Sequence, residues 1–100
     1  MDGVAVREER VELRITILGR VQGVGYRWYV REAATRFGVT GWTSNLPDGS
    51  VRIEAGGLRA AIDAFIAALR QGPPHAHVMD VRVEARPAAD PLPEHFTIQR

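Results

Sequence analysis

The sequence contains no cysteine, and this absence excludes several kinds of chemistry together. Disulfides, thiolate metal sites and thiol nucleophiles all need a sulfhydryl group. Lysine is absent too, because all 13 basic residues are arginine. The chain therefore lacks both a P-loop lysine and a Schiff-base lysine. Arginine is the only fixed cation that it can offer to an anionic ligand.

Long apolar runs are also missing. No stretch approaches the roughly 18 apolar residues of a membrane helix. The first ten residues have neither the basic start nor the apolar run of a signal peptide. A formal net charge of +1 gives little attraction to nucleic acid or to a membrane. We expect a cytoplasmic protein with a flexible lead-in at residues 1–9 and one domain at residues 10–100.

The residues that are present follow strand and helix periods. Apolar residues at every second position of 11–17 predict a strand. Apolar stripes over 26–37, ended by Gly38, and over 58–69, ended by Gly72, predict two helices. Further strands are predicted at 39–44, 51–55, 79–85 and, as a short last strand, 96–98.

This order of elements is β-α-β-β-α-β with a short terminal strand. It predicts an α+β, ferredoxin-like βαββαβ sandwich, with two helices on one face of a mainly antiparallel sheet of four to five strands. In that topology the loop after the first strand and the hairpin after the second strand lie at the same end of the sheet. Arg27 and Asn45 are therefore expected to be neighbours.

The segment from Gly19 to Arg27, with the sequence GRVQGVGYR, joins the first strand to the first helix. Glycine lets the backbone approach a ligand closely, and free N–H groups at a helix start favour an anion. Arg27 follows at once and can bind a tetrahedral oxyanion through two parallel hydrogen bonds. We interpret the segment as a phosphate cradle. The alternatives are a tight turn without a ligand and a solvated surface arginine.

Asn45 opens a turn-rich segment, Asn45–Gly49, between two predicted strands. Its carboxamide can both donate to and accept from a water or a substrate. The alternative is an Asx-type turn, in which the side chain bonds only to its own backbone. Asp48 is interpreted as a turn residue.

Other side chains are expected to have no chemical role. His75 and His77 lack the cysteine or carboxylate partners of a metal site, so no metal is expected. The aromatic residues Trp28, Tyr29 and Trp42 are expected to pack in the core or to be half-buried.

Two separated motifs resemble the acylphosphatase family. They are Gly19–Arg27 and the run Gly41-Trp42-Thr43-Ser44-Asn45 followed by Asp48-Gly49, and the similarity extends to Phe96-Thr97-Ile98. It covers about residues 11–100. Members of this family hydrolyse acyl phosphates, which are mixed anhydrides of carboxylic and phosphoric acids, to a carboxylate and inorganic phosphate.

The resemblance implies a role for each motif. Arg27 would bind the phosphoryl group and stabilise its transition-state charge, and Asn45 would orient the attacking water. No cofactor, metal or covalent intermediate is implied, and we expect a monomer acting on a small-molecule acyl phosphate. The implied phosphate-binding residues, acting through their backbone amides, are Gln22, Gly23, Val24, Gly25, Tyr26 and Arg27.

Two other functions compete with this one. The first is a non-catalytic acylphosphatase-like module that binds anions or carbamoyl phosphate for a partner enzyme, as in hydrogenase-maturation carbamoyltransferases. The second is RNA binding, which needs exposed aromatic residues on the central strands. The expected outer face offers charged and polar residues instead, so no nucleic-acid partner is expected. Those residues are Glu12, Arg14, Thr16, Arg52 and Glu54.

Overall fold

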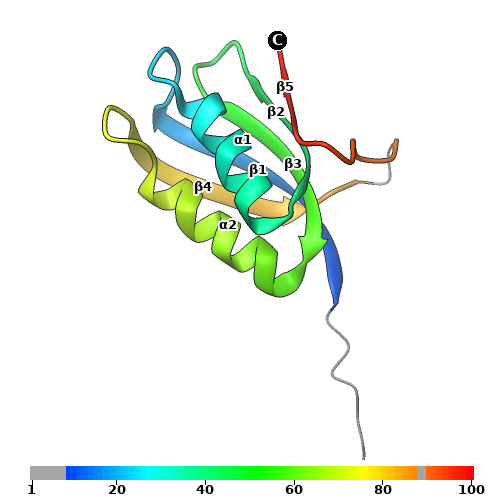
Figure 1. Ribbon diagram of the computed structural model, residues 1–100. Helices are drawn as coiled ribbons and strands as arrows, with labels where there is room; N and C mark the ends of the chain where they lie inside the picture. Colours follow the sequence, from blue (N-terminus) through cyan, green and yellow to red (C-terminus); the bar gives the residue numbers. More distant parts are fainter. Residues whose placement is uncertain (1–8, 88–89) are drawn as a thin grey trace, which may run out of the picture.

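Figure 1 shows the computed structural model, which describes residues 9–87 and 90–100. The lead-in expected at residues 1–9 lies, up to residue 8, outside the described residues. No described helix is long and apolar enough to cross a membrane. In chain order the elements are β1 (Arg10–Arg20), α1 (Tyr26–Phe37), β2 (Thr40–Asn45), β3 (Val51–Leu58), α2 (Arg59–Gln71), β4 (His77–Ala85) and β5 (Thr97–Gln99).

The strands form one five-stranded sheet in the order β4-β1-β3-β2-β5. β1 pairs antiparallel with β3 and with β4, and β2 pairs antiparallel with β3. The short β5 instead runs parallel to β2, so the sheet is mixed. Both helices lie on one face of this sheet (Figure 1). The predicted α+β, ferredoxin-like fold is confirmed.

The core lies between the two helices and the sheet. Ile15 and Ile53 reach it from the central strands, Val30 from α1 and Phe65 from α2, and all four are fully buried. Each such side chain stabilises the fold by roughly 1.5–3 kcal/mol. The apolar stripes that predicted the helices therefore form their inner faces. Leu58 is an exception, because it ends β3 instead of joining the α2 stripe, and it is exposed.

Edge strand β4 departs from the predicted alternation at Met79. The register shifts where Val78 pairs with Gly19 and Asp80 with Leu18, so Met79 is the additional residue of a β-bulge. A bulge shifts the alternation of side chains by one position between the residues before it and the residues after it. Val78 consequently packs against the core, while the side chain of Met79 is 75% exposed.

The opposite face of the sheet carries a buried ion cluster where exposed charges were expected. Glu54 is only 5% exposed. One of its carboxylate oxygens accepts a hydrogen bond from Arg14 Nε at 2.9 Å, and the other accepts one from Arg86 Nε at 2.6 Å. Arg86 follows β4 and also donates to the carbonyl of Asp90. The chain after β4 thus covers part of this face.

The ion cluster gives the fold a pH dependence. Burial acts to raise the pKa of Glu54, but hydrogen bonds from Arg86 and Arg14 outweigh it and hold this pKa below its ordinary value of 4.5. The carboxylate therefore stabilises the fold at pH above about 4.5, and this contribution is lost as the pH falls through the folded-state pKa.

We expect Glu54→Gln to lower the free energy of unfolding at pH 7 by about 3 kcal/mol, because it removes the buried counter-charge of Arg86 and leaves only the exposed Glu12 as its ionic partner. Urea unfolding of both proteins measures this difference, which should narrow as the pH is lowered below 4.5. The exposed Glu84→Gln serves as the control and should change stability by less than about 0.5 kcal/mol. A difference that is independent of pH would contradict the role given to this carboxylate.

Candidate active site

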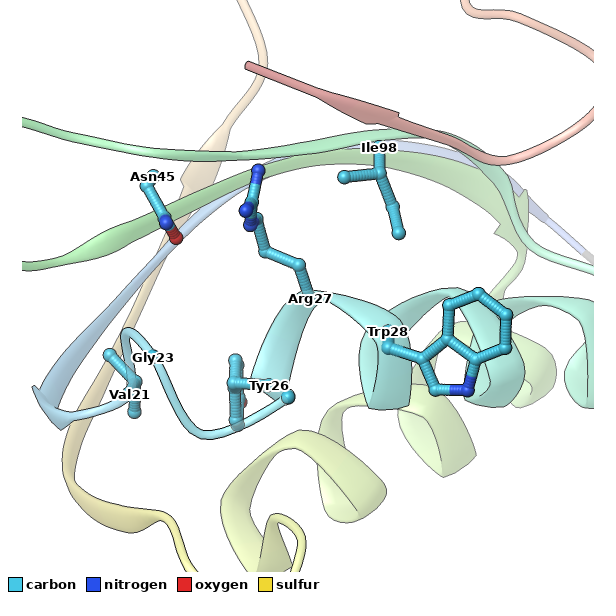
Figure 2. A pocket seen from close by; sticks show the side chains of 8 residues that line it. Val21, Gly23, Tyr26, Arg27, Trp28, Asn45 and Ile98 are labelled. Atoms are coloured by element: carbon cyan, nitrogen blue, oxygen red, sulfur yellow. The ribbon is translucent and has the colours of Figure 1, made fainter.

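A pocket of about 200 Å³ lies where the β1–α1 loop faces the end of β2 (Figure 2). Arg27 and Asn45 both line it, so the structure brings together the two side chains that the topology predicted to be neighbours. The lining residues are Val21, Gly23, Gly25, Tyr26, Arg27, Trp28, Asn45 and Ile98.

The loop backbone presents unpaired donors to this pocket. Gly23 and Gly25 adopt left-handed conformations with φ of 74° and 77°, which side chains other than glycine's disfavour. Gly25 is the N-cap of α1, and its cap makes no side-chain hydrogen bond. The backbone N–H groups of residues 22–27 donate to none of the described residues. Together with the helix dipole, these N–H groups favour a bound anion.

Gln22 fastens this loop to the β2–β3 hairpin. Its side-chain Nε2 donates to the backbone carbonyls of Leu46 and Ser50, both at 2.8 Å. From the sequence, Gln22 was predicted only as a backbone donor. A glutamine that bonds to carbonyls 24 and 28 positions away leaves no local pattern that would reveal it.

The hairpin itself is held by Asp48. Its Oδ1 accepts hydrogen bonds from Ser50 N–H at 2.9 Å and from Ser50 Oγ at 2.6 Å. These bonds lower the pKa of Asp48. The interpretation of Asp48 as a turn residue is confirmed.

Arg27 is the second residue of α1 and is half-buried. Its Nη1 donates to the backbone carbonyl of Gln99 in β5 at 3.0 Å. In Figure 2 the side chain extends across the pocket, between Asn45 and Ile98. Because β5 holds one nitrogen of the guanidinium, Arg27 is more than the solvated surface arginine considered from the sequence. Its other N–H groups are left for a ligand.

Asn45 ends β2, and Figure 2 shows its amide on the side toward Arg27. Its Oδ1 is buried and has no hydrogen-bond partner among the described residues. An unsatisfied buried acceptor costs about 1–3 kcal/mol, which a water or a ligand would relieve. The Asx-turn alternative is wrong, since the residue two positions on is Pro47, which has no N–H group to donate.

Two predicted loop residues have no polar side-chain group free for a ligand. Tyr26 is buried, and its hydroxyl donates to the carbonyl of Leu69 at 2.8 Å. Burial also raises the pKa of this hydroxyl well above its ordinary value. Val24 packs against the core. Both residues can therefore offer only backbone N–H groups to a ligand.

Trp28 corrects the prediction that it packs in the core or is half-buried, because its side chain is 58% exposed. It lines the pocket beside Arg27. The neighbouring Tyr29 carries the apolar stripe of α1 instead, with its hydroxyl donating to Ala68 at 2.7 Å. Sequence reasoning therefore missed Trp28 as a residue of the pocket.

The described part of the chain gathers no group of three or more histidine, cysteine, aspartate or glutamate residues that could hold a metal ion. His75 and His77 are exposed and lie with Arg20 along a different hollow.

Comparisons with known proteins identify the relatives of this chain. The sequence model of the acylphosphatase family matches residues 13–98. An acylphosphatase of Salinibacter ruber is 48% identical over 93% of this chain and 95% of its own length. One of Rubrobacter xylanophilus is 42% identical over 88% of this chain and 80% of its own length.

Solved structures give the same result. The crystal structure of the acylphosphatase from Bacillus subtilis has a TM-score of 0.82 and 35% identity, covering 89% of this chain and 98% of that one. Full-length HypF matches 94% of this chain with 12% of its own, at 25% identity and a TM-score of 0.77. From the family match and these relatives, the chain belongs to the acylphosphatase family.

Proposed function

We propose that Arg27 and Asn45 are the catalytic residues with which this acylphosphatase hydrolyses acyl phosphates to a carboxylate and inorganic phosphate. The observation that carries the proposal is the meeting of three groups in one pocket. They are the loop backbone at Gly23, Gly25 and Tyr26, whose N–H groups donate to none of the described residues, the guanidinium of Arg27, and the unpartnered Oδ1 of Asn45.

The loop and Arg27 suit a phosphoryl group. Several N–H donors that converge at a helix start bind its oxygens without a metal, and the guanidinium adds a full positive charge. These donors are held in place before the substrate arrives, by Gln22 on one side and by Gln99 on the other. Fixed donors stabilise charge in the transition state without having to reorganise.

Asn45 positions the attacking water. Its Oδ1 accepts one hydrogen bond from the water, which leaves a lone pair of the water oxygen directed at phosphorus. The described residues that line the pocket include no aspartate, glutamate or histidine to act as a base. The proton of the water therefore passes to a phosphoryl oxygen. A new P–O bond to the water oxygen forms while the P–O bond to the acyl group breaks, and the carboxylate leaves without needing a proton.

The rival function, a binding module that serves a partner enzyme, is not favoured. The structure of full-length HypF, in a phosphate- and nucleotide-bound form, matches this chain with only 12% of its own length, at 25% identity. The acylphosphatase of Salinibacter ruber is instead 48% identical and is covered over 95% of its length.

Hydrolysis of benzoyl phosphate tests the proposal. We expect the purified protein to hydrolyse it at the same rate with and without EDTA, since the donors described above hold the phosphoryl group without a metal. Inorganic phosphate should inhibit competitively, and p-nitrophenyl phosphate, whose leaving group is a phenolate, should be hydrolysed poorly. Phosphate binding without turnover would support the binding module instead. Loss of activity in EDTA that Mg²⁺ restores would contradict the metal-free mechanism.

We also propose that one chain, in a domain at residues 10–100, forms the whole site. In support of this, residues 21–98 alone supply the loop glycines, the guanidinium of Arg27 and the amide of Asn45 that the proposed mechanism uses. Size-exclusion chromatography at the assay concentration should give a monomer with full activity. The cytoplasmic location expected from the sequence stays a prediction.

A further inference from the structure

We propose that Trp28 and Ile98 form the surface that binds the acyl group, and that this surface selects acyl phosphates with large apolar or aromatic acyl parts. The inference rests on the proposed function, because it takes the phosphoryl group to be held by the loop and Arg27.

Trp28 is the starting observation. A tryptophan that is 58% exposed on a helix leaves much of its apolar surface in water, yet this one lies at the wall of the pocket. The guanidinium of Arg31, one helical turn further on, lies 4.0 Å from the centroid of its ring. Such a cation–π contact contributes roughly 0.5–1 kcal/mol at an exposed site. The ring is thereby held in place, so a ligand that packs against it loses little further rotamer freedom.

The in-line geometry of phosphoryl transfer indicates which part of the substrate contacts Trp28. In phosphoryl transfer the attacking and leaving oxygens lie roughly in line on opposite sides of phosphorus. In Figure 2, Asn45 lies on one side of Arg27, while Trp28 and Ile98 lie on the other. A water placed by Asn45 therefore directs the leaving acyl group toward Trp28 and Ile98.

The chemistry of this side fits an apolar group. Ile98 is half-buried and lines both the pocket and the hollow next to it, where the other lining residues are Arg27, Asn45 and Arg100. An indole and a branched aliphatic side chain bind apolar surface, and a tryptophan also stacks with aromatic rings. An acetyl group is too small to cover both side chains. The structure thus predicts selection by the size of the acyl group, independent of phosphate binding.

The test compares two substrates in three proteins: the wild type, Trp28→Ala and Trp28→Phe. For Trp28→Ala we expect kcat/KM for benzoyl phosphate to fall about tenfold, mainly through a higher KM, as the loss of one aromatic contact implies. For acetyl phosphate kcat/KM should change less than about twofold, because its methyl group makes little contact with the ring. Inhibition by phosphate should be unchanged, and Trp28→Phe should recover most of the loss.

Met79→Ala is the matched control, since it removes another exposed apolar side chain, which lines a different hollow from the active-site pocket, and it should affect neither substrate. Equal loss on both substrates would assign Trp28 a structural role at the start of α1 and overturn the inference. No loss on either substrate would also overturn it. If the wild type hydrolysed neither substrate, the proposed function itself would fail. If Arg27→Gln abolished activity but Trp28→Ala changed kcat/KM equally for both substrates, only the proposed acyl-group surface would be wrong.

Discussion

Replacing Arg27 with glutamine is expected to lower kcat/KM for benzoyl phosphate by at least about 10³-fold, the scale on which an arginine stabilises phosphoryl transfer. The guanidinium is the only charged group that lines the described pocket. Without it this pocket holds no charged group to face a dianionic substrate, so inorganic phosphate should no longer bind measurably by isothermal titration calorimetry. Binding and turnover are therefore lost together.

This loss should not come from unfolding. Arg27 places a positive charge in the first turn of α1, where it opposes the helix dipole by roughly 0.3–1 kcal/mol. Removing this unfavourable charge offsets the loss of the hydrogen bond to Gln99, which contributes about 1 kcal/mol to stability. The thermal midpoint of Arg27→Gln should thus stay close to that of the wild type.

Arg20→Gln is the matched control, because it removes one positive charge from an exposed residue just before the same loop. We expect less than about a threefold change in kcat/KM, because Arg20 does not line the pocket and solvent and salt screen its exposed charge. An equal loss in the two variants would show that general charge, and not the position of Arg27, governs activity. Substantial turnover by Arg27→Gln would contradict its catalytic role.

The second large effect is expected at Asn45. Asn45→Ala should lower kcat about 10²-fold, the loss seen when one positioned polar group of an active site is removed. The competitive inhibition constant of phosphate should hardly change, because the loop and Arg27 remain. Stability should be retained or should rise slightly, since the variant removes a buried acceptor that has no partner. Steady-state kinetics with phosphate as inhibitor separate the two effects.

A second variant, Asn45→Asp, tests the role of the neutral amide. The two side chains have nearly the same shape, but the aspartate adds a negative charge beside the phosphoryl site. We expect it to lose phosphate binding as well as turnover, because like charges repel at short range. If Asn45→Ala also lost phosphate binding, Asn45 would be a phosphate ligand, and its proposed role toward the water would be wrong.

The fold and the two catalytic candidates could be predicted because their signals are local. A strand of period two, two helical stripes and a glycine-rich junction each occupy a short run of sequence. The order of these elements then brought Arg27 and Asn45 to one end of the sheet without any knowledge of their contacts. The bulge at Met79 was not predictable, since one additional residue in an edge strand leaves the apolar pattern of 79–85 unchanged.

The remaining features depend on contacts between distant segments. Gln22 bonds to the hairpin, and Glu54 is buried because Arg86 returns over the outer face of the sheet. A charged residue on a strand is normally exposed to solvent, so the sequence of β3 led to the wrong prediction that Glu54 is exposed. Trp28 was expected to be packed for a similar reason, since an aromatic residue in a helix is most often part of the core.

The hydrogen bond from Arg27 to Gln99 joins residues 72 positions apart. Nearly all of the domain must therefore leave the ribosome before the arginine can be held in place. During synthesis, β1, α1, β2 and β3 are complete while β5 is still missing. The emerging chain passes through a stage that has the β1–α1 loop but not the contact that holds Arg27. The pocket is, in this sense, one of the last features of this domain to be completed during synthesis.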